Sequence, residues 1–351
     1  MSKCCLHCFS DLAIIEIIQR EGTFWNCSFC NSSDVLCIEP DNLTGLFELV
    51  LSCILESEQG DELHRFYTNE FKIVSDTVNN PAQLINEILG SGFDGKRFVL
   101  KEGISEYQEE WSTFKSHLIK ENRFFPNNSL YGKIFSTDVN NELSVSVEAA
   151  IFLRTVEALS KQRASGELFY RARVSEKPLQ ALKMGSPPSE ISSAGRANPA
   201  GIPYLYLAED LNTCCQEVRP SNGSKIYVSE IRAKKDLRLV DLTDPKQKIA
   251  LLKCEEEELE LTLKCLNLLQ QFSEELSKPV LPEKSHLDYI PTQFICEYLR
   301  TIRAYDGIVF NSSYGSGKNV VLFTDEHVQI DEPTAHTVTS VEVHVEASDH
   351  L

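Results

Sequence analysis

Hydrophobic positions change their spacing along this chain, from a helical repeat in the middle to a strand-like alternation later. Apolar residues recur every three or four positions over residues 43–54, 107–118 and 143–160. This spacing predicts amphipathic helices. Alternating or short apolar runs, which predict strands, cover residues 168–173, 203–208, 225–231 and 237–242. The pattern therefore predicts an α+β chain whose helical part precedes a mixed part.

Further along, the pattern predicts more helix and a final hairpin. A long helix is expected over residues 247–276 and another over 291–303. The acidic run Glu255–Glu258 is interpreted as a solvated helix face. A strand over 307–310 and a second over 319–323 are predicted to form a hairpin through its Gly-Ser-Gly turn.

The length of 351 residues exceeds what one hydrophobic core usually supports, about 250–300 residues. We therefore expect several folded parts. The expected parts are a metal-binding ribbon (residues 1–40), a helical domain (41–162), an α+β domain (163–331) and an acidic tail that frays (332–351).

The charge of the chain excludes several partners. Lys and Arg number 34 and Asp and Glu number 52, which gives −18. Duplex nucleic acid and anionic membranes are therefore not expected as main partners, although one small cationic pocket for a phosphorylated metabolite is compatible with this charge. No apolar run reaches the ~18 residues of a membrane helix. The N-terminus has no apolar signal core, so we expect a cytoplasmic location.

Four of the twelve cysteines form two C-x2-C pairs separated by eighteen residues, Cys5 with Cys8 and Cys27 with Cys30. This spacing is typical of a structural Zn²⁺ site, because two knuckles complete a tetrahedron of thiolates. The alternative is a set of free buried cysteines, and Cys4 is a substitute for Cys5. The first forty residues hold only two basic side chains, so a structural role is favoured over nucleic-acid binding.

The helical part over residues 41–162 offers no catalytic motif. An Arg followed four to six residues later by His on one helix would indicate RNase chemistry, and no Arg in the chain has that spacing. A scaffolding, sensing or inhibitory role is therefore expected for this part.

Three polar spots interrupt the apolar pattern of the last part. Arg171 and Arg173 share one face of a predicted strand, since neighbouring strand residues point oppositely. Residues 195–201 form a glycine-bounded loop that carries donors. Glu217 stands on a short predicted helix after a core strand. Each spot also has a structural interpretation: a salt bridge, a turn or a helix-face carboxylate.

The sequence strings around these spots closely resemble the RES-domain family, over about Gly166–Thr324. The strings that carry the resemblance are Tyr170–Arg173, Ser186–Pro188, Gly195–Ala208, Glu217–Pro220, Asp306–Ser313 and Gly317–Phe323. The residues before them are similar, more weakly, to the zinc-ribbon and HEPN/RES-type helical regions fused to some RES domains. The family is named after an Arg, a Glu and a Ser, which correspond to Arg171, Glu217 and Ser312, with Ser313 as the alternative serine.

The resemblance implies an ADP-ribosyltransferase-like fold and a toxin of a toxin–antitoxin pair. Such toxins deplete NAD⁺ by cleaving its nicotinamide–ribose bond, with phosphate or water as acceptor. Glu217 would then stabilise the oxocarbenium-like state, for which no general acid is required because the leaving nicotinamide is already cationic. The other expected contacts to NAD⁺ come from Arg171 and Arg196 to phosphates, Tyr206 to a ring, and Asn198, Ser312 and Ser313 to hydroxyls or phosphate.

Two other interpretations of the same residues stay open. A RES fold can transfer ADP-ribose to a macromolecule, or it can be an inactive binding module. A Rossmann dehydrogenase is not expected, because the sequence lacks its Gly-x-Gly-x-x-Gly fingerprint. An enzyme that destroys NAD⁺ must also be restrained, either by an antitoxin or by the helical part of the chain.

Overall fold

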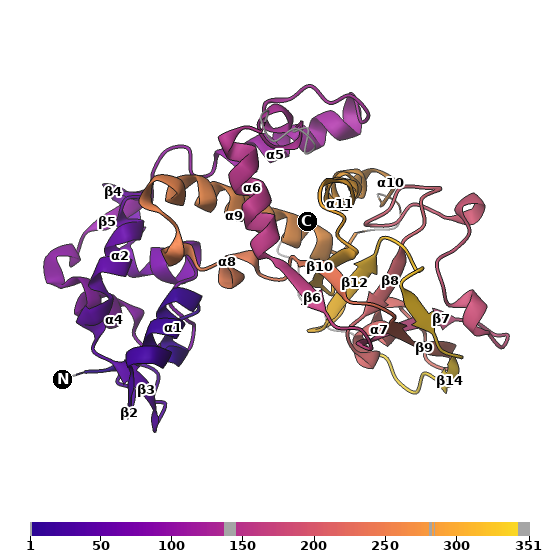
Figure 1. The fold of residues 1–351 in the computed structure, drawn as a ribbon, viewed down its shortest axis with the longest axis horizontal. Coiled ribbons are helices and arrows are strands. Elements are labelled where there is room, and N and C mark those ends of the chain that lie inside the picture. Colours follow the sequence, from indigo (N-terminus) through magenta and orange to yellow (C-terminus); the bar gives the residue numbers. More distant parts are fainter. Residues whose placement is uncertain (1, 137–144, 281–282, 284, 343–351) are drawn as a thin grey trace, which may run out of the picture. The chain divides into compact units, whose positions relative to one another are not determined.

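The computed structural model describes residues 2–136, 145–280, 283 and 285–342. They belong to two compact units (Figure 1). The first unit comprises residues 1–159 and 244–271, and the second comprises 160–243 and 272–351. In the described residues, every helix is too short or too polar to cross a membrane. The domain boundaries expected from the sequence stay predictions.

The first unit begins with a small antiparallel sheet whose strand order is β1-β3-β2. Its strands are β1 (Cys4–Cys5), β2 (Thr23–Trp25) and β3 (Val35–Ile38). Helix α1 (Leu12–Glu21) lies between the two cysteine pairs in sequence, and the spacing of the cysteines did not predict it. Asp11 caps it by accepting a hydrogen bond from the Ala13 amide at 2.8 Å.

Most of the predicted helices of the first unit are present. The predicted ones are α2 (Thr44–Leu51), α5 (Glu106–Lys120) and α6 (Val147–Ala158), and α3 (Leu63–Arg65) and α4 (Pro81–Leu89) are additional helices. Short π-helical and 3₁₀ turns cover 6–8, 40–43, 66–70, 91–93 and 131–135. The buried rings of Phe47 and Tyr67 stack 4.8 Å apart, and the Tyr67 hydroxyl donates to the Phe47 carbonyl at 2.6 Å. Residues 143 and 144 of the predicted helix 143–160 lie outside the described residues.

Two features of this unit differ from the expected helices. Strands β4 (Ile54–Glu62) and β5 (Arg97–Leu100) pair antiparallel, so Ile54 begins a strand and not a helix end. Most of β4 is exposed, which left no apolar alternation to predict it. The long helix begins at Glu256 and not at Gln247: residues 245–253 form α8 (Pro245–Lys248) and a 3₁₀ turn, and α9 (Glu256–Ser277) follows. The acidic residues in its first turn favour that start, because they complement the helix dipole.

The second unit is built on a nine-stranded sheet of order β13-β9-β7-β8-β12-β11-β10-β6, with β14 also paired to β9. Only the β10–β11 pair is parallel among the pairs of these described strands. The strands are β6 (Ser160–Arg163), β7 (Leu168–Val174), β8 (Leu205–Ala208), β9 (Lys225–Ala233), β10 (Leu237–Asp241), β11 (Gly307–Asn311), β12 (Lys318–Leu322), β13 (Val328–Ile330) and β14 (Thr334–Thr337). The predicted strands are thus confirmed.

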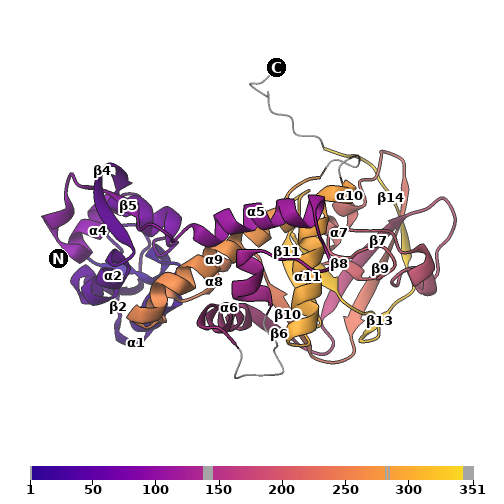
Figure 2. The same cartoon turned by 90° about the horizontal axis from the view of Figure 1, so that it is seen from above.

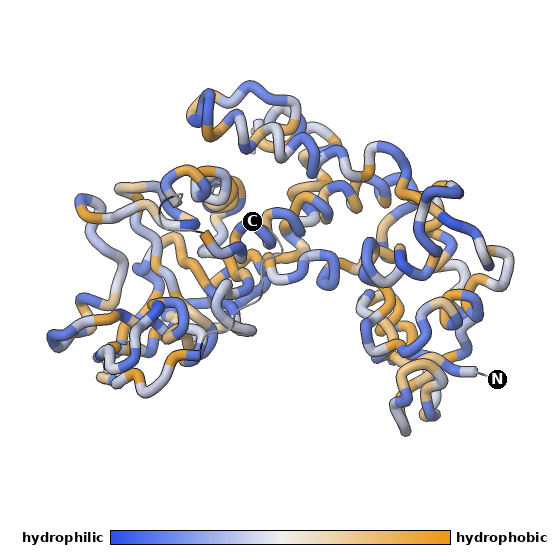
Figure 3. Tube along the Cα trace, turned by 180° about the vertical axis from the view of Figure 1, so that it is seen from behind, coloured by the Kyte–Doolittle hydropathy of each residue, from blue (hydrophilic) through white to orange (hydrophobic). Residues whose placement is uncertain are grey.

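Apolar side chains hold this sheet in place. Figure 3 shows hydrophobic residues along its strands, and a buried cluster includes Phe169, Leu207, Ile231, Val309 and Val320. Its helices are α7 (Leu211–Glu217), α10 (Ser285–Asp288) and α11 (Ile290–Ile302), with 3₁₀ turns at 181–183 and 189–191.

The acidic tail is more ordered than expected. The sequence predicted that residues 332–351 fray, yet β14 pairs with residues 225–228 of β9 (Figure 2). The backbone groups along β9 offer this segment a hydrogen-bonded partner, which the charge pattern of the tail did not reveal. Residues 343–351 lie outside the described residues.

Candidate functional site

The four cysteines of the two C-x2-C pairs converge in the first unit. The sulfurs of Cys5, Cys8, Cys27 and Cys30 all lie within 4.8 Å of one another. Neighbouring sulfurs are 3.4–3.9 Å apart. Four thiolates around one Zn²⁺ at about 2.3 Å would be about 3.8 Å apart. The geometry therefore fits a tetrahedrally bound metal ion.

The spare thiols of this region take other partners. The Cys4 thiol donates to the Ile38 carbonyl and the Cys37 thiol to the Trp25 carbonyl, each at 3.7 Å. Cys4 therefore does not replace Cys5 in the cluster. The Phe29 amide donates to the Cys27 sulfur at 3.4 Å, as is usual where a tight turn presents a thiolate to a metal.

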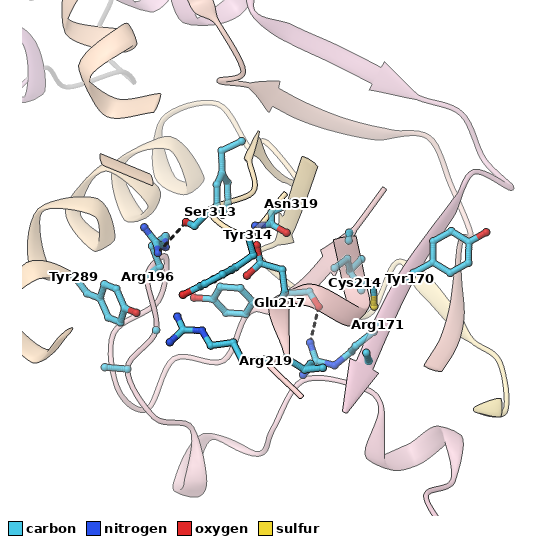
Figure 4. A pocket seen from close by; sticks show the side chains of 18 residues that line it. Tyr170, Arg171, Arg196, Cys214, Glu217, Arg219, Tyr289, Ser313, Tyr314 and Asn319 are labelled. Atoms are coloured by element: carbon cyan, nitrogen blue, oxygen red, sulfur yellow. Dashed lines mark hydrogen bonds between the residues drawn. The ribbon is translucent and has the colours of Figure 1, made fainter. Parts of the chain in front are cut away.

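The second unit contains a cavity of about 400 Å³ at the carboxyl end of α7, which we call the arginine cavity. Most of its lining comes from β7, β8, α7 and β12, with the segments at 194–196, 218–219 and 313–314 (Figure 4). Its charged lining residues are Arg171, Arg196, Glu217 and Arg219. In a chain of charge −18 this excess of guanidinium groups is local, which indicates an anionic ligand.

Glu217 is the only acidic residue among the described residues that line the arginine cavity. Its Oε1 accepts hydrogen bonds from the Ser312 hydroxyl at 2.5 Å and from the Asn319 amide nitrogen at 2.6 Å. Both bonds end at the same oxygen, and neither of them uses Oε2. Ser312 thus acts on the cavity through Glu217, while its neighbour Ser313 lines the cavity.

A close approach between the β11–β12 hairpin and α7 brings these groups together. A Cβ at Gly317 would lie 1.7 Å from the Thr213 hydroxyl oxygen. That hydroxyl donates at 2.6 Å to Asp210, which also caps α7 through the Thr213 amide. Only glycine leaves room here, and the contact fixes Ser312 and Asn319 beside the end of α7.

Arg171 projects from β7 into the cavity. Its Nη1 donates to the Tyr206 carbonyl on β8 at 2.7 Å (Figure 4). Burial, and secondly the nearby charge of Arg173, lowers the pKa of Arg171 to about 10. The group therefore stays cationic at neutral pH, and none of the described carboxylates forms an ion pair with it.

Arg196 is held at the other end of the cavity by the last turn of α9. Its Nη1 donates to the carbonyls of Glu275 at 3.2 Å and Lys278 at 2.5 Å. Carbonyls at a helix C-terminus carry partial negative charge and attract a cation. The guanidinium lies over the Tyr289 ring at 5.7 Å, and burial lowers its pKa. The Ser313 hydroxyl donates to the Ser277 carbonyl of the same turn at 2.6 Å.

Two residues expected to contact NAD⁺ also make hydrogen bonds inside the protein. The Tyr206 hydroxyl donates to Asn198 Oδ1 at 2.7 Å and accepts from the Ala197 amide. Asn198 is 3% exposed, and its amide nitrogen donates to the carbonyls of Ser193, Pro199 and Ile202. A loop without regular structure needs such partners for its carbonyls. Asn198 therefore shapes the loop, and Tyr206 offers the cavity its ring.

Sequence reasoning missed Asn319 and Arg219 as site residues. Asn319 is a largely buried polar residue directly before the apolar residues 320–322 of β12, and that contrast was the available signal. Arg219 has a φ of +47°, and its guanidinium lies 4.4 Å from the Tyr314 ring centroid. Left-handed backbone at a non-glycine residue is frequent at functional sites, but it is not visible in a sequence.

A family model described as the RES domain matches residues 168–344, and the chain belongs to this family. One solved structure, a chain of the MbcT–MbcA toxin–antitoxin complex of M. tuberculosis, is similar with 13% identity and a TM-score of 0.31. The match covers 55% of this chain and 94% of that one. At that TM-score the likeness carries no argument about the site. None of the curated proteins matches this chain.

Proposed function

We propose that this chain is an NAD⁺-degrading enzyme that cleaves the nicotinamide–ribose bond, and that it acts as a toxin. The observation that carries the proposal is the Glu217 carboxylate, held by Ser312 and Asn319 in a cavity with three guanidinium groups. Membership of the RES domain family supports the same assignment.

The guanidinium groups supply the affinity for the dinucleotide. NAD⁺ carries a negative charge on each of its two phosphates, and Arg171, Arg196 and Arg219 offer planar sets of donors that match phosphate oxygens. None of the three forms an ion pair in the described part of the chain. The rings of Tyr206, Tyr289 and Tyr314 also line the cavity and provide surfaces for flat bases.

The carboxylate supplies the chemistry. When the bond between ribose C1′ and the nicotinamide nitrogen breaks, its electron pair leaves with nicotinamide, which becomes neutral. Positive charge develops on the ribose, and the fixed Glu217 carboxylate stabilises it. Either a water oxygen then bonds to C1′ and releases a proton to solvent, or an anionic oxygen of phosphate bonds to C1′ without proton loss. Because two donors hold Glu217 in place before the reaction, little reorganisation is needed at the transition state.

The test measures consumption of NAD⁺ by the full chain. Free nicotinamide and protein labelled with ADP-ribose are both quantified. Glu217→Gln should lower turnover by about 10²–10³-fold, because it removes the negative charge while keeping the size of the side chain. Glu230→Gln, an exposed carboxylate on β9, is the matched control. Unchanged turnover in Glu217→Gln would refute the role of Glu217, and no nicotinamide release by the wild-type chain would refute the proposed activity.

The same assay identifies the acceptor. Release of nicotinamide that requires added inorganic phosphate indicates phosphorolysis, and release without it indicates hydrolysis. Labelled macromolecule in place of free ADP-ribose or its phosphate would replace the proposal with ADP-ribosyl transfer. Restraint by an antitoxin or by the helical part, and the cytoplasmic location, stay predictions.

We propose Zn²⁺ as the metal of the cysteine cluster. Four thiolates with no other ligand type favour zinc, and a closed set of four leaves no position for a substrate. The ion would hold the two knuckles together and take no part in catalysis. Elemental analysis of the purified chain should give one zinc per chain, and a metal-free chain with intact N-terminal structure would contradict the assignment.

A further inference from the structure

A second hollow, of about 440 Å³, adjoins the arginine cavity; we call it the side hollow. It shares Arg171, Tyr206 and residues 194–195 with the arginine cavity. The rest of its lining is Arg173, Tyr204 and residues 191–193, with Pro187 and Asn198. None of its described lining residues is acidic. Two guanidinium groups therefore face a space that contains no balancing carboxylate.

The two arginines stand close together without an ion pair. Arg171 and Arg173 are two residues apart on β7, on one face of the strand, and the charge of Arg173 helps to lower the pKa of Arg171. Neither forms an ion pair in the described part of the chain. Arginines elsewhere in the same sheet do, as Arg163 and Arg232 each contact two carboxylates. Like charges held together without a partner are unfavourable unless an anion joins them.

The hydrogen bonds of these arginines are also incomplete. Arg171 donates to the Tyr206 carbonyl and Arg173 to the Gly185 carbonyl at 3.1 Å. The Nε atoms of both side chains are buried and have no partner, and the Ser186 hydroxyl nearby has none either. Each guanidinium has five N–H donors, and buried donors without partners are rare in proteins.

The carboxylate of Asp325, near these arginines, already accepts a hydrogen bond from the backbone. Asp325 accepts a hydrogen bond from the Ser186 amide at 2.8 Å, and it raises the pKa of Arg171 only as a minor contribution. It therefore fixes the 185–186 turn beside Arg173 and does not neutralise the pair. A ligand with several oxygen acceptors and more than one negative charge would satisfy both arginines, and phosphate has this chemistry.

We propose that the side hollow is a phosphate-binding subsite centred on Arg173, distinct from the arginine cavity that holds Glu217. Its ligand is a phosphate group, carried either by free inorganic phosphate or by a dinucleotide with an additional phosphate on its adenosine ribose. Both sources present the same oxygens to the two guanidinium groups. The inference concerns binding alone, so it does not depend on the proposed cleavage of NAD⁺.

Calorimetric titration of inorganic phosphate into the full chain carrying Glu217→Gln tests this subsite without turnover. We expect saturable binding of one phosphate per chain. Adding Arg173→Gln should weaken it at least tenfold, and Arg173→Lys should weaken it less, because a lysine keeps the charge but not the fork of donors. Arg232→Gln, which removes an equal charge at an exposed position of β9, should leave binding within twofold. Thermal unfolding of each variant verifies that it is folded.

Two outcomes would overturn the proposal directly: phosphate does not bind saturably, or it binds with equal affinity with and without Arg173. A third outcome is loss of phosphate binding in Arg196→Gln but not in Arg173→Gln. That result would place the phosphate in the arginine cavity and would also overturn the proposal. The two sources are then separated by competition. If NADP⁺ displaces the bound phosphate, this displacement depends on Arg173, and NAD⁺ does not displace it, the subsite takes the additional phosphate of the dinucleotide. If neither displaces it, the subsite takes free phosphate, and both results support the subsite.

Discussion

The cysteine cluster and the arginine cavity are built from residues at very different distances along the chain. The four thiols fall within residues 5–30 and come from two short turns around one small sheet. The groups around Glu217 range from Arg171 to Asn319 and come from β7, α7, the β11–β12 hairpin and the end of α9. One site is assembled locally and the other depends on the pairing order of a nine-stranded sheet.

This difference has an energetic consequence. A three-stranded sheet of two to four residues per strand has a small core, so a metal ion bound by the four cysteines would stabilise the fold of this region. The arginine cavity lies against a large apolar core that includes Phe169 and Val320, and its charged side chains add little to that core. We therefore expect ligand changes in the cluster to unfold their region, and changes in the cavity to affect binding and turnover.

The largest expected effect follows from Cys27→Ser. Metal binding supplies about 10–16 kcal/mol in zinc-finger peptides, and losing one of four thiolates removes much of that stabilisation. The variant should lose its metal, and amides of residues 3–38 should exchange rapidly with deuterium. Cys37→Ser is the matched control, because Cys37 is buried beside the cluster but is not part of it. Intact protection in the metal-free variant would show that this region does not depend on its metal.

The second effect concerns the arginine cavity, where we expect substitutions to affect ligand binding and not folding. Arg171→Ala should weaken NAD⁺ binding by about 30- to 1000-fold, or 2–4 kcal/mol, because a charged group facing the phosphates is lost. Titration of NAD⁺ into the Glu217→Gln background measures this change without turnover. Arg232→Ala provides the control on the same sheet. Equal affinities would remove Arg171 from the phosphate site.

The same contrast decides how much could be predicted from the sequence. The cysteine spacing predicted its cluster in full, because two turns of fixed length bring the thiols together. Arg171 and Glu217 stood out as polar residues in an apolar pattern, the resemblance to the RES-domain family assigned their roles, and both line one cavity. Asn319 and Arg219 were missed because their roles depend on sheet register and on a left-handed backbone. Strand β4 was missed because it has no buried face. Strand β14 was missed because its partner strand β9 lies about a hundred residues away in the sequence.

The third effect is on stability, within the second unit. Gly317→Ala would place a methyl group on the Thr213 hydroxyl, so the β11–β12 hairpin must move away from α7. We expect a loss of about 1–3 kcal/mol in the free energy of unfolding, together with lower turnover. Urea unfolding measures the first quantity. Gly45→Ala is the control, since a Cβ there meets nothing within 4 Å and the residue lies in helix α2, where alanine is favoured. A stable, fully active Gly317→Ala chain would contradict the proposed contact.

The smallest effect distinguishes residues that position Glu217 from those that bind the substrate. Asn319→Ala removes one of the two donors to Oε1, and we expect kcat to fall about tenfold, or 1.4 kcal/mol, with KM nearly unchanged. Ser312→Ala should behave alike, and the double variant should lose less than the product of the two, because both donors hold the same oxygen. A rise in KM at constant kcat would instead mean that Asn319 contacts the substrate directly. Independent effects of the two substitutions would mean that Ser312 and Asn319 do not act together through Glu217.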